Sequence, residues 1–138
     1  MEKKLFTLQE ANALLPQLNE DLLKLQELTK QFEEKFLELQ KKKAVHEKFG
    51  GRTEGGEQDL FFEEESRLEF MRMEAKLLID NFALKGVLLK MVNPGLVDFP
   101  AVVDGEEVLI CWKQGEERIT HYHGWDEGFV GRKPHPEA

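Results

Sequence analysis

The chain has 138 residues, the size of one ordinary domain, so we expect one hydrophobic core or two small packed parts rather than several modules. It carries 27 acidic against 19 basic residues, a net charge of −8, which argues against nucleic-acid binding because affinity for phosphates comes from Lys and Arg. Charged residues make up 33% of the chain, above the roughly one quarter that is usual in globular domains, and this excess points to long exposed helices.

Targeting and disulfide signals are missing from the sequence. No uninterrupted apolar segment near the N-terminus has the length of a signal peptide, and no segment approaches the ~20 apolar residues of a membrane span. Cys111 is the single cysteine, so the chain has neither an intramolecular disulfide nor a CxxC motif. Its apolar neighbours favour a buried, inert thiol over a nucleophile. We therefore expect a cytoplasmic protein that contacts no membrane.

A first long helix is predicted over residues 7–48. Thr7 as N-cap, with Glu10 three residues later, forms a capping box that specifies where the helix starts. Ten positions at alternating spacings of three and four residues form a seam along this helix, and nine of them are apolar. These positions are Leu8, Ala11, Leu15, Leu18, Leu22, Leu25, Thr29, Phe32, Phe36 and Leu39. The repeat is typical of a coiled coil.

A second helix is predicted over residues 58–85, after a glycine-rich turn over residues 49–57. Its seam runs through Phe61, Leu68, Met71, Ala75, Leu78 and Phe82. Gly86 is placed to end the helix in the left-handed conformation. The two helices therefore form an antiparallel, coiled-coil-like hairpin.

The position of the turn gives this hairpin a register. A turn centred near residues 52 and 53 makes positions whose numbers sum to about 106 face each other. The three lysines at 41–43 then lie opposite the three glutamates at 63–65, and each run also complements the dipole of its own helix. We interpret both charge runs as structural.

The first helix extends past the second. By the same register, the second helix ends near Asp21, so residues 8–20 overhang and must bury Leu15 and Leu18 against something else. The candidates are the C-terminal part of the chain or a second copy of the hairpin. Because two helices alone make a thin core, we expect a homodimer in which two hairpins form a four-helix bundle.

The final third of the chain changes to the patterns of strands. A small antiparallel meander of three or four strands is predicted over residues 87–123, in which residues 87–92 fit either a strand or a helical extension. Asp104-Gly105 between two strand-like runs is a strong hairpin signal, and Gln114-Gly115 repeats it. The predicted fold is thus a single α+β domain over residues 1–138, with a long helical hairpin followed by a small sheet.

Two further features concern the borders of this sheet. Pro100 cannot donate to a ladder, so its strand should lie at an edge or carry a bulge there. Residues 124–138 combine glycines with aromatic residues, which is poor for regular structure but suits a fixed loop folded over a surface. This C-terminal loop is the most site-like part of the chain.

The residues that can carry chemistry lie near this loop. The candidate functional cluster consists of Asp98, Glu116, His123, Asp126 and Arg132. In the run over residues 118–123, the side chains of Ile119, His121 and His123 project to one face. His121, His123 and Asp126 form a candidate ligand set, because imidazole and carboxylate suit Zn, Ni or Fe(II). The interpretation that we favour makes His123 a hydrogen-bonded structural residue that anchors the loop.

The sequence leaves an enzymatic role open. His123 with Asp126 or Asp98 could form a general acid–base pair, and Arg132 could hold an anionic substrate. Arg132 could equally form an ion pair that fixes the loop to Asp98 or Glu116. None of the motifs GxxxxGK, GxGxxG, GxSxG and HExxH occurs. The sequence therefore requires no cofactor, and a divalent metal is the alternative.

Several uncommon residues recur in the order of a known family. They are Phe6-Thr7-Leu8, EANALLP at residues 10–16, Gly86-Val87, Leu89-Lys90, GLVDFPA at residues 95–101, Cys111-Trp112, Gly115-Glu116, His123, Gly128-Phe129 and Gly131-Arg132. With them, nearly the whole chain resembles the uncharacterised bacterial domain-of-unknown-function family 2203. The resemblance implies a bacterial protein of one domain and brings no known activity, cofactor or substrate. The family has an aromatic pair before the histidine that matches His123, whereas this chain has His121-Tyr122, which weakens any function that requires both histidines.

Most of the chain is devoted to helix seams and caps. We therefore expect a non-catalytic, dimeric helical-hairpin protein that acts as an interaction or scaffold module. The alternative is a divalent metal-binding protein, with or without catalysis, whose site lies at His123 and Asp126 on the sheet and C-terminal loop.

Overall fold

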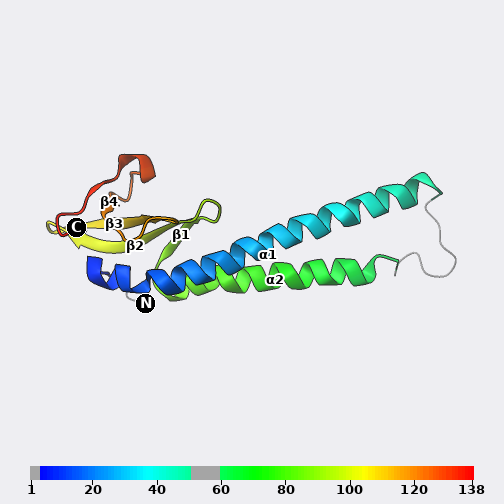
Figure 1. The fold of residues 1–138 in the computed structure, drawn as a ribbon, viewed down its shortest axis with the longest axis horizontal. Coiled ribbons are helices and arrows are strands. Elements are labelled where there is room, and N and C mark those ends of the chain that lie inside the picture. The colour runs from blue at the N-terminus through cyan, green and yellow to red at the C-terminus, as the bar shows by residue number, and fades with distance from the viewer. Residues whose placement is uncertain (1–3, 51–59) are drawn as a thin grey trace.

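Two long helices and a small sheet make up the molecule (Figure 1). A computed structural model describes residues 4–50 and 60–138. Helix α1 (Leu8–Lys48) and helix α2 (Phe62–Leu84) pack as a hairpin and are followed by a five-stranded antiparallel sheet, so the predicted α+β fold class is confirmed. The predicted turn beyond residue 50 and the first two residues of the predicted second helix lie outside the described residues. No helix in the described ranges is long and apolar enough to cross a membrane.

Local sequence signals set the ends of the helices. Thr7 caps α1, because its Oγ1 accepts a hydrogen bond from Glu10 N at 3.0 Å while Glu10 Oε1 accepts one from Thr7 N at 2.9 Å, and the predicted capping box is confirmed. α2 begins at Phe62 rather than at residue 58, because the two residues before it form a turn. Gly86 follows α2 with a φ of +85°, the left-handed conformation that ends a helix.

Ion pairs between the helices confirm the predicted register. Lys42 Nζ lies 3.4 Å from Glu64 Oε1, and Lys43 Nζ lies 3.4 Å from Glu65 Oε2. Near the other end of α2, Lys85 forms an ion pair with the buried Asp21. The lysine run at 41–43 and the glutamate run at 63–65 therefore face each other, as the position of the turn predicts.

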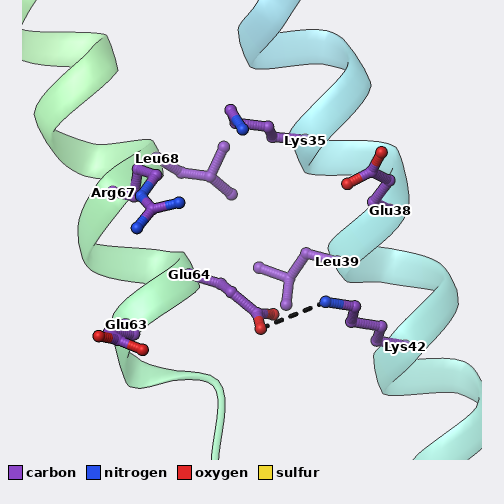
Figure 2. Close-up of a pocket in the computed structure, with 8 residues that line it drawn as sticks. All are labelled: Lys35, Glu38, Leu39, Lys42, Glu63, Glu64, Arg67 and Leu68. Carbon is purple, nitrogen blue, oxygen red and sulfur yellow. Dashed lines mark hydrogen bonds and ion pairs between the residues drawn. The ribbon is translucent and has the colours of Figure 1, made fainter.

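The charged end of the hairpin contains a pocket of about 230 Å³ (Figure 2). In Figure 2, Leu39 and Leu68 point toward one another between the helices, with the Lys42–Glu64 pair beside them. The charged lining residues are three bases and three acids, namely Lys35, Lys42, Arg67, Glu38, Glu63 and Glu64. Such a balance selects no charged ligand, and exposed ion pairs contribute only ~0–1 kcal/mol to stability. We therefore interpret the charged residues of this pocket as residues that align the two helices, rather than as a ligand-binding site.

The five strands follow one another in chain order across the sheet. They are β1 (Leu88–Met91), β2 (Leu96–Val103), β3 (Glu106–Lys113), β4 (His121–His123) and β5 (Lys133–Pro134), and every neighbouring pair is antiparallel. For residues 87–92 the sequence fits either a strand or a helical extension, and β1 shows that residues 88–91 form a strand. The sheet exceeds the predicted three or four strands and the predicted range of 87–123, because β5 comes from the segment expected to be only a loop.

The strand β4 is shorter than the sequence pattern indicates. Residues 114–120 connect β3 to β4, so Gln114-Gly115 does not close a two-residue hairpin. Ile119 leaves the ladder because it is buried in the main core, where its backbone N donates to Asn12 Oδ1 at 2.7 Å. The expectation that Ile119 shares a sheet face with His121 and His123 is therefore wrong.

The first half of α1 and the sheet share one hydrophobic core. Its central members from α1 are Leu15, Leu18 and Leu22, and from the sheet Val97, Phe99, Ile110 and Trp112. In Figure 1, the first turns of α1 lie along the sheet. The predicted overhang is thus covered by the C-terminal part of the same chain rather than left for a second copy.

Pro100 occupies an edge position within β2, as its missing N–H requires. β1 pairs with β2 only at residues 96–98, so at Pro100 this side of β2 has no strand partner. The backbone N of Phe6 donates to the carbonyl of Pro100 at 2.7 Å instead. The segment before α1 therefore covers this edge of the sheet.

Candidate functional site

The face of the sheet that points away from α1 carries the polar residues. Cross-strand partners in an antiparallel ladder share a face, and Cys111 pairs with Asp98 on one side and His121 on the other. His123 pairs with Leu109, so it lies in the neighbouring row of the same face. In Figure 1, the C-terminal segment arches over this side of the sheet, opposite α1. The fold thus brings polar residues of β2, β3 and β4 together under that segment.

A tight turn fixes the position of Asp98 against Cys111. Asp104 and Gly105 have φ values of 51° and 81°, the left-handed conformations that a two-residue hairpin of type I′ needs. Because two residues close the turn, β2 and β3 pair without a bulge from Val103 opposite Glu106 down to Asp98 opposite Cys111. The sequence signal at the turn therefore determines which side chains meet at the site.

Asp98, Cys111 and His123 form a buried group. His123 Nε2 lies 3.2 Å from Asp98 Oδ2, and the exposed fraction of each residue is 3%. Cys111 is 2% exposed, and one ligand atom from each of the three residues lies within 4.8 Å of the others. On its other side, His123 Nδ1 is 2.8 Å from the carbonyl oxygen of Gly124. We name these three residues the polar cluster.

Burial shifts the pKa values of two members of the polar cluster, Asp98 and Cys111. It raises the pKa of the Asp98 carboxyl above its ordinary value, and the nearby His123 opposes this shift only in part. Burial, assisted by the charge of Asp98, raises the pKa of the Cys111 thiol to about 12. A thiol with such a pKa is protonated at neutral pH and is a poor nucleophile. The predicted burial of Cys111 is confirmed, whereas its membership in a polar cluster was not predicted.

Arg132 and Glu116 lie beside the polar cluster. Arg132 Nη2 is 2.9 Å from Glu116 Oε2, so of the two predicted ion-pair partners for Arg132 the structure selects Glu116. The hydrogen bond to Glu116 raises the pKa of Arg132, and the guanidinium also lies 4.2 Å from the ring centroid of Phe129. Arg132 acts electrostatically on Cys111, and its buried Nη1 has no hydrogen-bond partner. The C-terminal segment is thus anchored by an ion pair next to the thiol.

His121 and Asp126 lie outside the polar cluster. The Nδ1 atom of His121 is 2.8 Å from Thr120 Oγ1, and Asp126 is exposed. Gly124 N donates to Glu127 Oε1 at 2.9 Å, so Glu127 holds the start of the C-terminal segment. Within the described ranges, the only group of three or more metal-capable side chains is Asp98, Cys111 and His123. The structure therefore groups His123 with Asp98 and Cys111 rather than with His121 and Asp126.

Residues that carried the family resemblance also line a groove of about 480 Å³ between α1 and the β3–β4 connection. Asn12 and Pro16 lie on the helix side, and Trp112, Gly115 and Glu116 on the sheet side. Trp112 Nε1 donates to the carbonyl of Glu116 at 3.0 Å, which orders the connection. The groove lies where the first turns of α1 meet the sheet, and Asn12 joins the two sides there through its hydrogen bond with the backbone N of Ile119.

Comparison with known proteins identifies a family. Residues 4–135 match the family of uncharacterised conserved proteins DUF2203. No curated protein and no solved structure matches the chain.

Proposed function

We propose that this chain, which belongs to the DUF2203 family of uncharacterised conserved proteins, is a non-catalytic interaction module. In this proposal, its helical hairpin binds a second copy of itself. The observation that carries the proposal is an exposed apolar stripe on the outer face of α2. We define this outer stripe as Phe70, Met73, Leu77 and Leu84.

The spacing of the outer stripe is that of a second helix seam. Its members follow one another after three, four and seven residues, which places them on one side of α2. Their exposed fractions run from 58% to 81%. The face of α2 that packs against the rest of the chain uses other residues, Leu68, Met71 and Phe82. Exposed apolar residues aligned on one side of a helix are typical of protein interaction surfaces.

Two ion pairs lie beside the outer stripe. Arg72 Nη1 lies 3.4 Å from Glu69 Oε2, and Lys76 Nζ lies 2.9 Å from Asp80 Oδ2. Each of these pairs is neutral as a unit, so these four residues add no net repulsion to a contact between two copies. Twofold symmetry is the commonest arrangement in homo-oligomers, and a twofold contact of two hairpins would produce the expected four-helix bundle.

The chemistry of the polar cluster supports a non-catalytic role. A nucleophilic cysteine needs a lowered pKa and access to substrate, whereas Cys111 is buried with a raised pKa. The proposal includes a cytoplasmic location, which suits a chain that has a single buried cysteine and needs no disulfide.

Light scattering after gel filtration at micromolar concentration tests the proposal. We expect the wild-type protein to have the mass of a dimer and Leu77→Glu to have that of a monomer, because a charge in the stripe must be desolvated in the contact. Val130→Glu is the matched control, since Val130 is 98% exposed but lies on the C-terminal segment, and this variant should stay dimeric. A wild-type monomer would contradict the proposal.

A further inference from the structure

The ring nitrogens of His123 face two acceptors. A backbone carbonyl can only accept, so the 2.8 Å contact with Gly124 requires Nδ1 to carry a proton. In the neutral ring, Nε2 then presents a lone pair to Asp98 Oδ2 at 3.2 Å. Two lone pairs at this distance in a buried site need a positive centre between or beside them. A proton can fill that role, and so can a metal ion.

Cys111 supplies a third donor to the same point. Its sulfur lies within 4.8 Å of both the carboxylate oxygen and the imidazole nitrogen, and its thiol interacts with Asp98. The three donors come from three adjacent strands, β2, β3 and β4, whose pairing holds them in place. Ligand atoms at roughly 2.0–2.3 Å from a tetrahedral ion lie roughly 3.3–3.7 Å apart, so small side-chain movements would close the site around an ion.

We propose that Asp98, Cys111 and His123 bind a divalent ion of the zinc class. Thiolate and imidazole favour Zn²⁺ over the hard ions Mg²⁺ and Ca²⁺, which take oxygen ligands. Three protein ligands fill three of the four positions of a tetrahedral ion. Gly124 is the outer partner that a ligating histidine ordinarily has, because its carbonyl fixes the ring orientation through Nδ1.

The charges balance when the ion binds. The ion displaces the thiol proton of Cys111 and the proton held between Asp98 and His123, and it meets one thiolate and one carboxylate. Two negative ligands neutralise the two positive charges of the ion. The neighbouring pair of Arg132 and Glu116 adds no net charge, and its 2.9 Å contact keeps Glu116 engaged away from the ion.

This site is independent of self-association. The outer stripe belongs to α2, whereas the polar cluster lies on the sheet face that points away from the helices. Loss of metal binding would leave the dimer proposal intact, and a monomeric protein would leave the metal proposal intact. The set also differs from the ligands expected from sequence, because Asp98 and Cys111 take the places of His121 and Asp126.

Titration of untagged, chelator-treated protein with Zn²⁺ and Co²⁺ tests the site. We expect one Zn²⁺ per chain by elemental analysis, and a near-ultraviolet absorption band from thiolate bound to Co²⁺. Cys111→Ser should abolish the band and weaken binding by about 100-fold or more, at least as much as the loss of an outer partner. His121→Ala is the matched control, since it removes the neighbouring histidine of the same strand and should change neither readout.

Three results would overturn the proposal. They are a wild-type protein that binds no stoichiometric Zn²⁺, a Co²⁺ band that survives in Cys111→Ser, and a His121→Ala variant that loses binding as strongly as Cys111→Ser. The first result needs no variant, so it decides the question even if substitution of a buried residue impairs folding. Circular dichroism of each variant shows which comparisons use folded protein.

Discussion

The hairpin and the sheet differ in the kind of side chain that each places against the usual pattern, since the hairpin exposes large apolar groups and the sheet buries ionisable ones. The outer face of α2 leaves Phe70, Leu77 and Leu84 in solvent, whereas the sheet buries Asp98 and His123 almost completely. Exposed large apolar groups and buried ionisable groups are both unfavourable in an isolated chain. The two proposals assign each region a different partner, a second copy of the hairpin for the outer stripe and a divalent cation for the polar cluster.

The largest expected loss of unfolding free energy comes from a substitution in the polar cluster. Asp98→Ala removes the carboxyl group that faces both His123 and Cys111, and loss of one partner from a buried pair costs about 3–5 kcal/mol of unfolding free energy. Urea denaturation of metal-free protein measures it. Asp126→Ala, at an exposed carboxylate of the C-terminal segment, should change the free energy by less than about 0.5 kcal/mol. Equal effects of the two substitutions would contradict the role of Asp98.

The next effect distinguishes the two ends of α1. Leu18 is fully buried under the sheet, so Leu18→Ala should cost about 2–5 kcal/mol through lost burial and the cavity that remains. Leu37 lies on the same helix but is mostly exposed, and Leu37→Ala should cost less than about 0.5 kcal/mol. Denaturant unfolding compares the two. Similar costs would mean that the sheet does not cover the start of α1.

The two regions should also respond to pH with opposite signs. In metal-free protein, burial raises the pKa of Asp98 above its ordinary value of 3.8, so the folded state retains a proton that the unfolded chain has lost, and this contribution to stability falls as pH rises above about 4. Hydrogen bonds from Thr7 lower the pKa of Glu10 from its ordinary value of 4.5, so its contribution is present above about pH 4.5 and is lost as pH falls.

Unfolding free energies measured from about pH 3 to about pH 7 check these signs. The unfolding free energy of the wild type minus that of Asp98→Asn should decrease as pH rises. The unfolding free energy of the wild type minus that of Glu10→Gln should increase. If both differences changed in the same direction as pH rises, one of the two carboxyl environments would be contradicted.

The smallest effect concerns the exposed charges of the hairpin. Lys42→Glu should cost only ~0.5 kcal/mol, since the pair with Glu64 is exposed to solvent. The double variant Lys42→Glu with Glu64→Lys should recover most of that loss, because it restores the attraction with the charges exchanged. Failure of the double variant to recover stability in a double-mutant cycle would argue against the register at this position.

The sequence predicts the hairpin better than the site because the two depend on different kinds of information. A capping box, two seams and opposing charge runs are repeated along the chain, and the ion pair between Lys42 and Glu64 follows from the position of the turn. The pairing of Asp98 with Cys111 also follows from the turn at Asp104-Gly105, so that half of the site was accessible from register alone.

The other half of the site was not accessible from local patterns. Residues 114–120 form an irregular connection, so nothing in the sequence fixes the alignment of β4, and with it His123, against β3. The two-residue strand β5 includes Pro134 and has no recognisable strand pattern. Cys111 was interpreted only by its apolar neighbours along the chain, whereas its polar neighbours, Asp98 and Arg132, come from other segments.

Native mass spectrometry of untagged protein supplied with Zn²⁺ tests both halves of the comparison at once. We predict a complex of two chains that carries one zinc ion per chain. A single chain without a bound ion would contradict the two proposals, that the apolar stripe on α2 binds a second copy and that the polar cluster on the sheet binds a divalent ion.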